Sequence, residues 1–259
     1  MGKPTICASM AEAVADFQDD SMLMIPGFGP GSPHNLMTAL YYQGAKGLTT
    51  VSNGVGFPSA DPRMKGLGDL VADGRVKKVI AAFTASTRPS RASTAEDMIR
   101  NGTLEAELSP QGTLAERIRA GGAGIPAFFT PAGVGTLVAT GKETREFNGR
   151  TYLMEHALFA DYAFIRAHRA DTAGNLIFRL SARNFNPIMA MAARTTIVEV
   201  EEPIVPAGEL DPDQIHLPGI YVQRLVQIPP DGIFSVNRQA MVGLQQQRAD
   251  SPPGGDLPR

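Results

Sequence analysis

Short apolar runs alternate with amphipathic stretches through the first half of the chain. The runs carry few charged residues, which is typical of strands buried on both faces of a sheet. We expect strands at 22–25, 48–52, 76–83 and 104–108, and helices from Ser9, after Pro33, at 66–72 and at 94–100. Because strands and helices alternate, the pattern predicts βαβ units and a sheet that is parallel at its start.

The second half of the chain changes in character. Segments 144–147 and 150–154 flank Asn148-Gly149, a pair that strongly favours a two-residue hairpin turn. Further strands are expected at 162–168, 176–179, 195–200 and 220–226, with a helix from Asn186 to about residue 193. The sequence therefore predicts an α/β fold, an open and mostly parallel sheet flanked by helices with an added antiparallel hairpin.

The chain has 259 residues, which suits one large domain or two small ones and is enough to bury most of the apolar surface. We expect one domain to span residues 1–228. Residues 229–259 are rich in Pro, Gly, Gln and Asp, and they are predicted to form a loosely packed tail.

The charge and amino-acid composition of the chain limit which kinds of molecule it can bind. The formal net charge of −2 gives no electrostatic basis for binding nucleic acid or an anionic membrane. Cys7 is the single cysteine, so an intrachain disulfide is excluded, and no apolar run reaches the roughly 18 residues of a membrane span. The N-terminus lacks the pattern of a signal peptide, and the four histidines lack metal-site spacing. We expect a cytoplasmic protein with no metal, nucleic acid or membrane partner.

A loop and a well-marked helix span Ser109–Gly122. Thr113 and Glu116 have the spacing of a capping box, and Gly121-Gly122 can end the helix. Gln111 stands just before this predicted helix, where a neutral amide suits binding of a carbonyl or carboxylate. The alternative is a well-capped connection between a strand and a helix, with no chemical role.

A glycine-rich loop follows the predicted strand at 22–25. It contains Gly27, Phe28 and Gly29, and it lies where open α/β sheets bind their ligands. A dinucleotide fingerprint is disfavoured because Ser32 stands where the third glycine belongs. Ordinary turn chemistry and a ligand-binding loop remain open at this point.

Several long, ordered stretches resemble one family, the class I CoA-transferases. They match the A (alpha) subunit of 3-oxoacid CoA-transferases, of the succinyl-CoA:3-ketoacid or 3-oxoadipate type. The matching stretches are 109–136, 145–149, 169–176, 182–187 and 215–222, within a likeness that covers roughly residues 10–226. The resemblance implies transfer of CoA between an acyl-CoA and a 3-oxoacid or dicarboxylate, as in ketone-body or aromatic degradation. It implies a CoA thioester as substrate and no permanently bound cofactor.

The resemblance also assigns expected roles to residues. Gly27, Phe28 and Gly29 correspond to a loop on the CoA side, although Pro26 replaces the first glycine of the family's Gly-Gly-Phe-Gly segment. Asn53 and Gln111 become neutral amides that face the reacting carbonyl. Gly54 replaces a second asparagine that lines the acyl pocket in relatives.

Segment 83–89 departs most from the family pattern. Relatives typically carry Gly-Glu-Asn there, whereas this chain has hydroxyl side chains and Arg88. Because arginine suits bidentate capture of a carboxylate, Arg88 is a candidate substrate-binding residue. A solvated surface loop is the alternative. Segment 183–186 also resembles the family and is interpreted as mainly structural.

The catalytic nucleophile of the family is missing from this chain. In relatives a glutamate in a Ser-Glu-Asn-Gly segment of the B (beta) subunit forms an acyl-glutamyl anhydride and then a glutamyl-CoA thioester. The nearest string here, Ser52-Asn53-Gly54, has no glutamate. The resemblance therefore implies that a B subunit is the partner, in an A2B2 heterotetramer or a related even oligomer.

Two other functions stay open at this point. One is the A subunit of a related enzyme that hydrolyses a ring β-oxo acyl-CoA, an alternative that the altered loops leave open. The other is a non-catalytic ligand-sensing α/β module, similar to the sensor domains of sugar-phosphate-responsive regulators. That module would lack its usual helix-turn-helix and basic face here.

Overall fold

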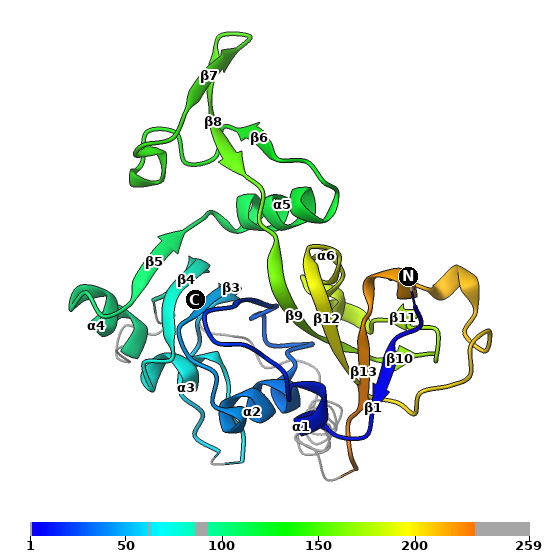
Figure 1. The fold of residues 1–259 in the computed structure, drawn as a ribbon. Helices are drawn as coiled ribbons and strands as arrows, with labels where there is room; N and C mark the ends of the chain where they lie inside the picture. The colour runs from blue at the N-terminus through cyan, green and yellow to red at the C-terminus, as the bar shows by residue number, and fades with distance from the viewer. Residues whose placement is uncertain (1, 62, 86–92, 231–259) are drawn as a thin grey trace, which may run out of the picture.

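An eight-stranded parallel sheet forms the centre of the molecule (Figure 1), in a computed structural model that describes residues 2–61, 63–85 and 93–230. The strand order is β1-β13-β12-β9-β2-β3-β4-β5, and every neighbouring pair is parallel. The strands are β1 (Thr5–Cys7), β2 (Met22–Ile25), β3 (Leu48–Gly54), β4 (Val76–Phe83), β5 (Glu105–Leu108), β9 (Ala160–Ala167), β12 (Ala193–Val200) and β13 (Arg224–Gln227). The predicted α/β class and mostly parallel sheet are confirmed. Strand β1, which has three residues, was not predicted.

Helices cover both faces of this sheet. They are α1 (Met10–Ala13), α2 (His34–Gln43), α3 (Leu67–Ala72), α4 (Thr94–Arg100), α5 (Gln111–Gly122) and α6 (Asn186–Met191). Helices α1–α4 pack in one core, while α5 and α6 pack in a second. Along β2 the side chains alternate between the two cores, with Leu23 and Ile25 in the first and Met24 in the second. Such alternation explains why the strand reads as a continuous apolar run.

A small antiparallel sheet stands away from the body on the side of α5 and α6 (Figure 1). It consists of β6 (Ala127–Thr130), β8 (Arg150–His156) and β7 (Thr144–Phe147), in that order. We call residues 125–157 the arm. The predicted hairpin is confirmed, because Asn148 and Gly149 both have positive φ, 49° and 73°. Strand β6 was not predicted.

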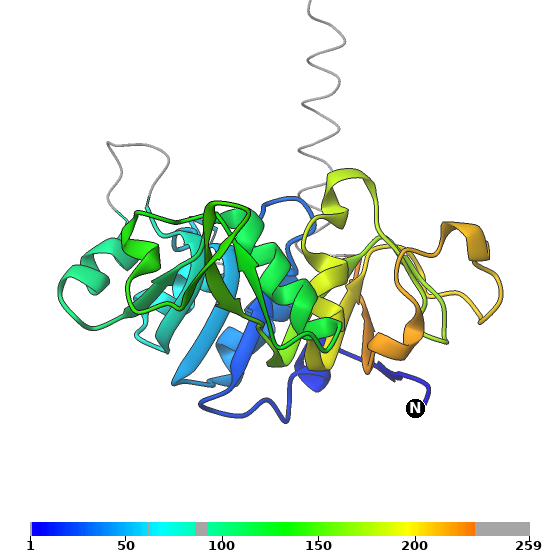
Figure 2. The same ribbon diagram turned by 90° about the horizontal axis from the view of Figure 1, so that it is seen from above.

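Short elements complete the described chain. Strands β10 (Arg169–Ala170) and β11 (Leu176–Ile177) form an antiparallel pair. The 3₁₀ helices are η1 (Leu137–Ala139), η2 (Leu180–Arg183), η3 (Pro212–Gln214) and η4 (Gly219–Tyr221). The view along the perpendicular direction (Figure 2) shows the irregular segments that contain η2, η3 and η4 at one side of the sheet. Nearly all of the predicted tail, from residue 231 onward, lies outside the described residues.

Helix α5 differs from its prediction at its start and in the conformation of its last residues. It begins at Gln111, two residues before the predicted cap, and Thr113 is buried inside it. Glu116 pairs with Arg119 at 2.6 Å, so the predicted capping box is wrong. The helix ends at Gly122, as predicted, but neither Gly121 nor Gly122 takes the left-handed conformation, which belongs to Gly124 with φ of 71°.

Close packing explains why Gly121 and Gly122 lie within α5. A Cβ atom at Gly121 would lie 1.9 Å from the carbonyl oxygen of Leu158. A Cβ atom at Gly122 would lie 2.8 Å from the Cβ of Met191 in α6. The two glycines therefore let α5 approach the start of β9 and the end of α6. No helix among the described residues is long and apolar enough to cross a membrane.

Replacement of these helix glycines gives the first testable prediction. Gly121→Ala should lower the free energy of unfolding by about 1–3 kcal/mol or more, because the new methyl group overlaps a backbone carbonyl that cannot move freely. Gly112→Ala is the matched control, since a Cβ there meets no atom within 4 Å. The control should be neutral or stabilising by up to about 1 kcal/mol through helix propensity. Guanidinium unfolding of both variants tests this, and equal effects would contradict it.

Candidate functional site

The predicted site residues lie at one edge of the sheet. Strands β2, β3, β4 and β5 are parallel neighbours, so their carboxyl ends meet at the same edge. Asn53 is near the end of β3, Gln111 follows β5 as the first residue of α5, and the glycine loop follows β2. This edge is where open α/β sheets bind ligands.

The two predicted amides contact each other. The Nε2 of Gln111 donates a hydrogen bond to the Oδ1 of Asn53, across 58 positions of sequence. Asn53 is only 3% exposed, whereas Gln111 is exposed. The contact orients both side chains and leaves a second hydrogen on Nε2 of Gln111, so the pair can present neutral N–H donors to an incoming oxygen.

The glycine loop lies directly against Asn53 and Gly54. The backbone N–H of Asn53 donates to the carbonyl of Pro26 at 3.3 Å. Gly27 has φ of 64°, and a Cβ there would lie 3.0 Å from the carbonyl oxygen of Gly54. Only a residue without a side chain permits this approach at low cost. The structure thus brings Gly27 beside Asn53, and the next loop residue, Phe28, is 44% exposed.

Three side chains hold consecutive carbonyl groups of this loop. Asn184 Nδ2 donates to the carbonyl of Pro30 at 2.8 Å. Asn186 Nδ2 donates to that of Gly31 at 3.2 Å. Arg166 Nη1 donates to the carbonyl of Ser32 at 3.3 Å. These bonds fix the path of the loop, so segment 183–186 does more than begin a helix.

A largely buried ion pair supports these contacts. Arg166 pairs with Glu201 through Nε and Oε1 at 3.0 Å, and the other oxygen of Glu201 lies 2.9 Å from Nδ1 of His168. Burying an arginine is costly unless its charge is paired and its donors are used. Here the pairing lets Arg166, only 6% exposed, reach the loop from β9.

Glu199 of β12 fixes the start of α2, the helix that follows the loop. Its Oε2 accepts from the backbone N–H groups of Asn35 and Leu36, both at 2.9 Å. Pro33, at the cap position, makes no side-chain cap. Burial raises the pKa of Glu199 to about 7, against the opposing effect of Arg166. The sequence prediction missed Glu199, although a lone acid in a β-branched strand was a usable signal.

The wall beside Gly54 is formed by an aromatic ring. A Cβ at Gly54 would lie 2.5 Å from Cζ of Phe83, which is its neighbour on β4. A side chain at position 54 would therefore require that ring to move. Arg88, the predicted substrate-binding residue, lies outside the described residues.

The acid nearest to the Gln111 loop in sequence is already engaged. Glu107 pairs with Arg117 at 2.7 Å and with Lys78 at 3.2 Å. Such pairing holds a carboxylate in place and lowers its reactivity as a nucleophile. Among the described residues, no three His, Cys, Asp or Glu side chains are grouped so as to hold a metal ion.

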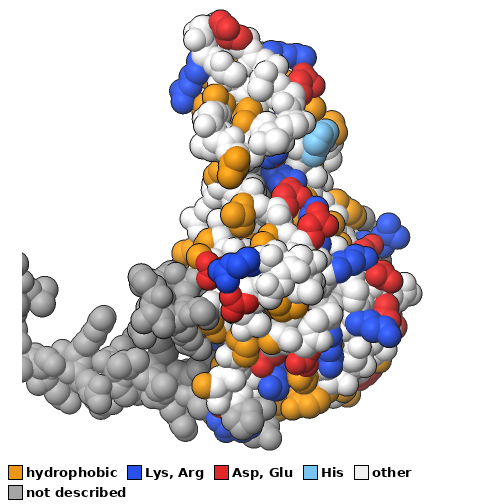
Figure 3. All heavy atoms as spheres, turned by 90° about the vertical axis from the view of Figure 1, so that its left-hand side faces the viewer, with side chains coloured by type: hydrophobic (Ala, Val, Ile, Leu, Met, Phe, Trp, Pro, Cys, Tyr) orange, Lys and Arg blue, Asp and Glu red, His pale blue; other side chains and the backbone are white. Residues whose placement is uncertain are grey.

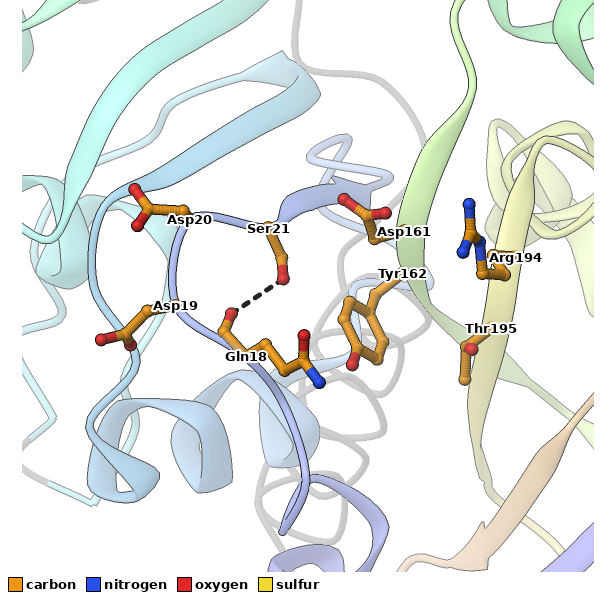
Figure 4. A pocket seen from close by; sticks show the side chains of 8 residues that line it. All are labelled: Gln18, Asp19, Asp20, Ser21, Asp161, Tyr162, Arg194 and Thr195. Atoms are coloured by element: carbon orange, nitrogen blue, oxygen red, sulfur yellow. Dashed lines mark hydrogen bonds between the residues drawn. The ribbon is translucent and has the colours of Figure 1, made fainter.

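A recess of about 370 Å³ lies at the other end of the sheet (Figure 4). Its lining residues are Gln18, Asp19, Asp20, Ser21, Asp161, Tyr162, Arg194 and Thr195, at the amino ends of β2, β9 and β12. The carboxylate of Asp161 accepts from the N–H of Met22 at 2.9 Å, and Asp20 pairs with Lys77 at 2.8 Å. These acids stabilise the entry into the strands and lie at the opposite edge of the sheet from the amide pair.

Comparison with known proteins assigns the chain to a family. The family described as Coenzyme A transferase matches residues 7–227. The A subunit of the succinyl-CoA:3-ketoacid coenzyme A transferase of Xanthomonas campestris is 53% identical over 220 residues, which cover 85% of each chain. The A subunit of the 3-oxoadipate CoA-transferase of Pseudomonas putida is 48% identical over 221 residues, covering 85% of this chain and 92% of the relative.

Solved structures agree with the fold. An acyl-CoA transferase of Escherichia coli O157:H7, in a thioester complex with CoA, is 25% identical with a TM-score of 0.73. The match covers 88% of this chain and 48% of that one, so this chain spans about half its length. Glutaconate coenzyme A-transferase of Acidaminococcus fermentans shares the fold at 20% identity and a TM-score of 0.72, over 87% of this chain and 76% of that one. Since the family match spans most of the chain and relatives are about half identical, this chain belongs to the coenzyme A transferase family.

Proposed function

We propose that the chain is the A (alpha) component of a two-subunit CoA-transferase that moves CoA between an acyl-CoA and a 3-oxoacid or dicarboxylate. The observation that carries this proposal is the contact between Gln111 and Asn53, beside the glycine loop at the carboxyl edge of the sheet. Relatives that are themselves named as A subunits support it. A CoA thioester is the substrate, and no permanently bound cofactor takes part.

The amide pair would serve the transition state. Attack on a thioester carbonyl places negative charge on its oxygen, and fixed N–H donors stabilise that charge because they need not reorient. A single donor of this kind is worth roughly 3 kcal/mol. Neutral amides suit the task, since they stabilise the oxyanion without holding the carboxylate product too tightly.

The B subunit would supply the nucleophile. A glutamate carboxylate attacks the acyl carbon and CoA leaves as a thiolate. The thiolate then attacks the glutamyl carbon of the anhydride, which releases the first carboxylic acid and leaves glutamyl-CoA. The acceptor acid reverses the two steps. The A2B2 arrangement, or a related even oligomer, would bring this glutamate to the amide pair.

The glycine loop would bind the CoA side of the thioester. Gly27 and Gly29 have positive φ, and the carbonyls of residues 30–32 are turned toward the side chains that hold them. Phe28 stays partly exposed, so its ring is free to contact the substrate. Holding the loop in advance lowers the entropy cost of binding.

Reconstitution tests the proposed function. The purified chain alone should show no CoA transfer, and addition of a second protein that carries the Ser-Glu-Asn-Gly glutamate should restore it. The assay uses a panel of acyl-CoA donors and carboxylate acceptors, with a glutamate-to-glutamine partner as control. Transfer by the single chain, with no partner found by mass spectrometry, would overturn the proposal. Release of free CoA without an acceptor would instead favour the ring-opening hydrolase.

Alanine variants test the amide pair. Gln111→Ala should lower kcat of the assembled enzyme on the order of a hundredfold, because the donor acts in the transition state. Asn53→Ala should act in the same direction but less. Gln214→Ala, an exposed amide on η3, is the matched control and should leave kcat unchanged. Unchanged kcat in both site variants, at normal folding, would remove the amide-pair role.

Arg88 is proposed to bind the distal carboxylate of a dicarboxylic substrate. Arg88→Ala should then raise KM for dicarboxylates far more than for acetate or acetoacetate, with a smaller change in kcat, because a distal contact binds the ground state and the transition state alike. Arg88→Lys should recover little, since a point charge lacks the bidentate fork. Equal shifts in KM for mono- and dicarboxylates would show that this assignment is wrong.

A further inference from the structure

The two faces of the arm are unlike each other. On β8 the side chains of Leu153 and Glu155 are buried, at 0% and 2% exposed. Lys142 binds Glu155 at 2.6 Å, and a Cβ at Gly133 would lie against both Val138 and Leu153. Segment 131–143 therefore covers this face of the three strands. We call it the covered face.

On the opposite face, the described part of the chain shows no comparable covering segment. Strand register puts eight side chains there, and we call them the open face: Ala127, Phe129, Arg145, Phe147, Arg150, Tyr152, Met154 and His156. Phe147 is 41% exposed. Hydrophobic, basic and acidic side chains are all visible on the arm, which projects clear of the body (Figure 3). A three-stranded sheet with one face unpartnered buries little apolar surface for its size.

The open face is organised before any partner arrives. Phe147 packs edge-on against Phe129 and against Tyr152, each with ring centroids 5.4 Å apart. Arg145 lies over the ring of Phe129 at 5.0 Å, and Arg150 lies over that of Tyr152 at 5.8 Å. Tyrosine and arginine are among the residue types that dominate binding energy at interfaces. Because these rings and guanidinium groups already hold one another in place, little side-chain entropy is lost when a partner binds.

The charges on the open face select the kind of partner. Its strand residues include two arginines and no acid, while Glu143, just before β7, pairs with Arg145 at 3.4 Å. A two-fold contact between two copies of this face would bring like charges together, because the same patch meets itself in such an interface. Like-charge contact across an interface costs several kcal/mol. A different surface, apolar and carrying carboxylates, fits the face better.

We infer that the open face of the arm is the docking surface for the B subunit, which meets it with an apolar and acidic patch. This inference rests on the proposed two-subunit function. Helix α5 connects the face to the candidate site, since its first residue is Gln111 and its Arg117 holds the carbonyl of His156 at 2.8 Å. The B subunit, held on the arm, is thereby attached to the helix that carries Gln111.

Charge reversal and loss of a ring test the docking surface. The double variant Arg145→Glu/Arg150→Glu and the single variant Phe147→Ser should each raise Kd for the purified B subunit more than thirtyfold, as for residues that dominate an interface. The matched controls are Arg100→Glu on α4 and Tyr42→Ser on α2, exposed positions on the body. These should change Kd less than twofold. Calorimetry gives Kd, and amide exchange of β8 confirms that the arm stays folded.

Association and activity are measured separately, so two failures can be told apart. Unchanged Kd in all arm variants, with normal CoA transfer by the mixed proteins, overturns the docking surface and leaves the proposed function standing. Absence of transfer in a complex that forms normally overturns the proposed function alone. Arm variants that change self-association of this chain, or its binding of CoA when no partner is present, also overturn the docking surface. Recovery of transfer with the B subunit in excess, at weakened Kd, supports it.

Discussion

Three side chains hold the carbonyl groups of consecutive loop residues, and the candidate site depends on that restraint. Asn184 and Asn186 precede or begin α6, and Arg166 lies on β9, so the loop between β2 and α2 is fixed from the other half of the chain. A loop with several left-handed glycines would otherwise sample many conformations. The hydrogen bonds convert a permissive backbone into a defined surface beside Asn53.

The hydrogen bond from Arg166 to the loop depends in turn on the pairing of that buried arginine with Glu201. Arg166 can donate to the loop because Glu201 neutralises it, and Glu199 holds the first backbone N–H groups of α2 immediately after the loop. Removing one member would leave a buried charge or donor without a partner, which is expensive. The loop, the start of α2 and β12 are therefore linked by these buried polar contacts. The free-energy cost of burying the charged groups is offset only while each of them keeps its partner.

Local signals in the sequence predicted local structure well. Asn148-Gly149 predicted the hairpin because its positive φ values are a property of the turn itself. The strand at 22–25 was predicted from its continuous apolar run, which is likewise a local signal. The start of α5 and the conformation of its final glycines were predicted wrongly, and the close contact of Gly121 with Leu158 is a long-range constraint that the local pattern does not show.

The site was only partly predictable. Family resemblance, rather than spacing, brought Asn53 and Gln111 together, and the structure confirms that they touch while their catalytic roles stay predictions. The links from Asn186 to Gly31 and from Glu199 to Asn35 join residues 155 and 164 positions apart. No local pattern encodes such distances. An isolated acid in a buried strand signals a need for partners without saying where they lie.

In the proposed function, helix α5 carries both a chemical and a mechanical role, and its tight packing joins them. At its start Gln111 contacts Asn53, and toward its end Gly121 lies against the backbone at Leu158, where the arm returns to the sheet. A helix packed without side-chain clearance cannot slide or tilt independently of its neighbours. The position of the arm relative to Gln111 is therefore fixed by backbone contact. A nucleophile delivered by another protein chain must reach the reacting carbon with an error well below about 1 Å. A B subunit docked on a loosely attached arm could not be positioned that accurately. The close contact of Gly121 with Leu158 fixes the arm to α5, and thereby to Gln111 at the other end of the helix.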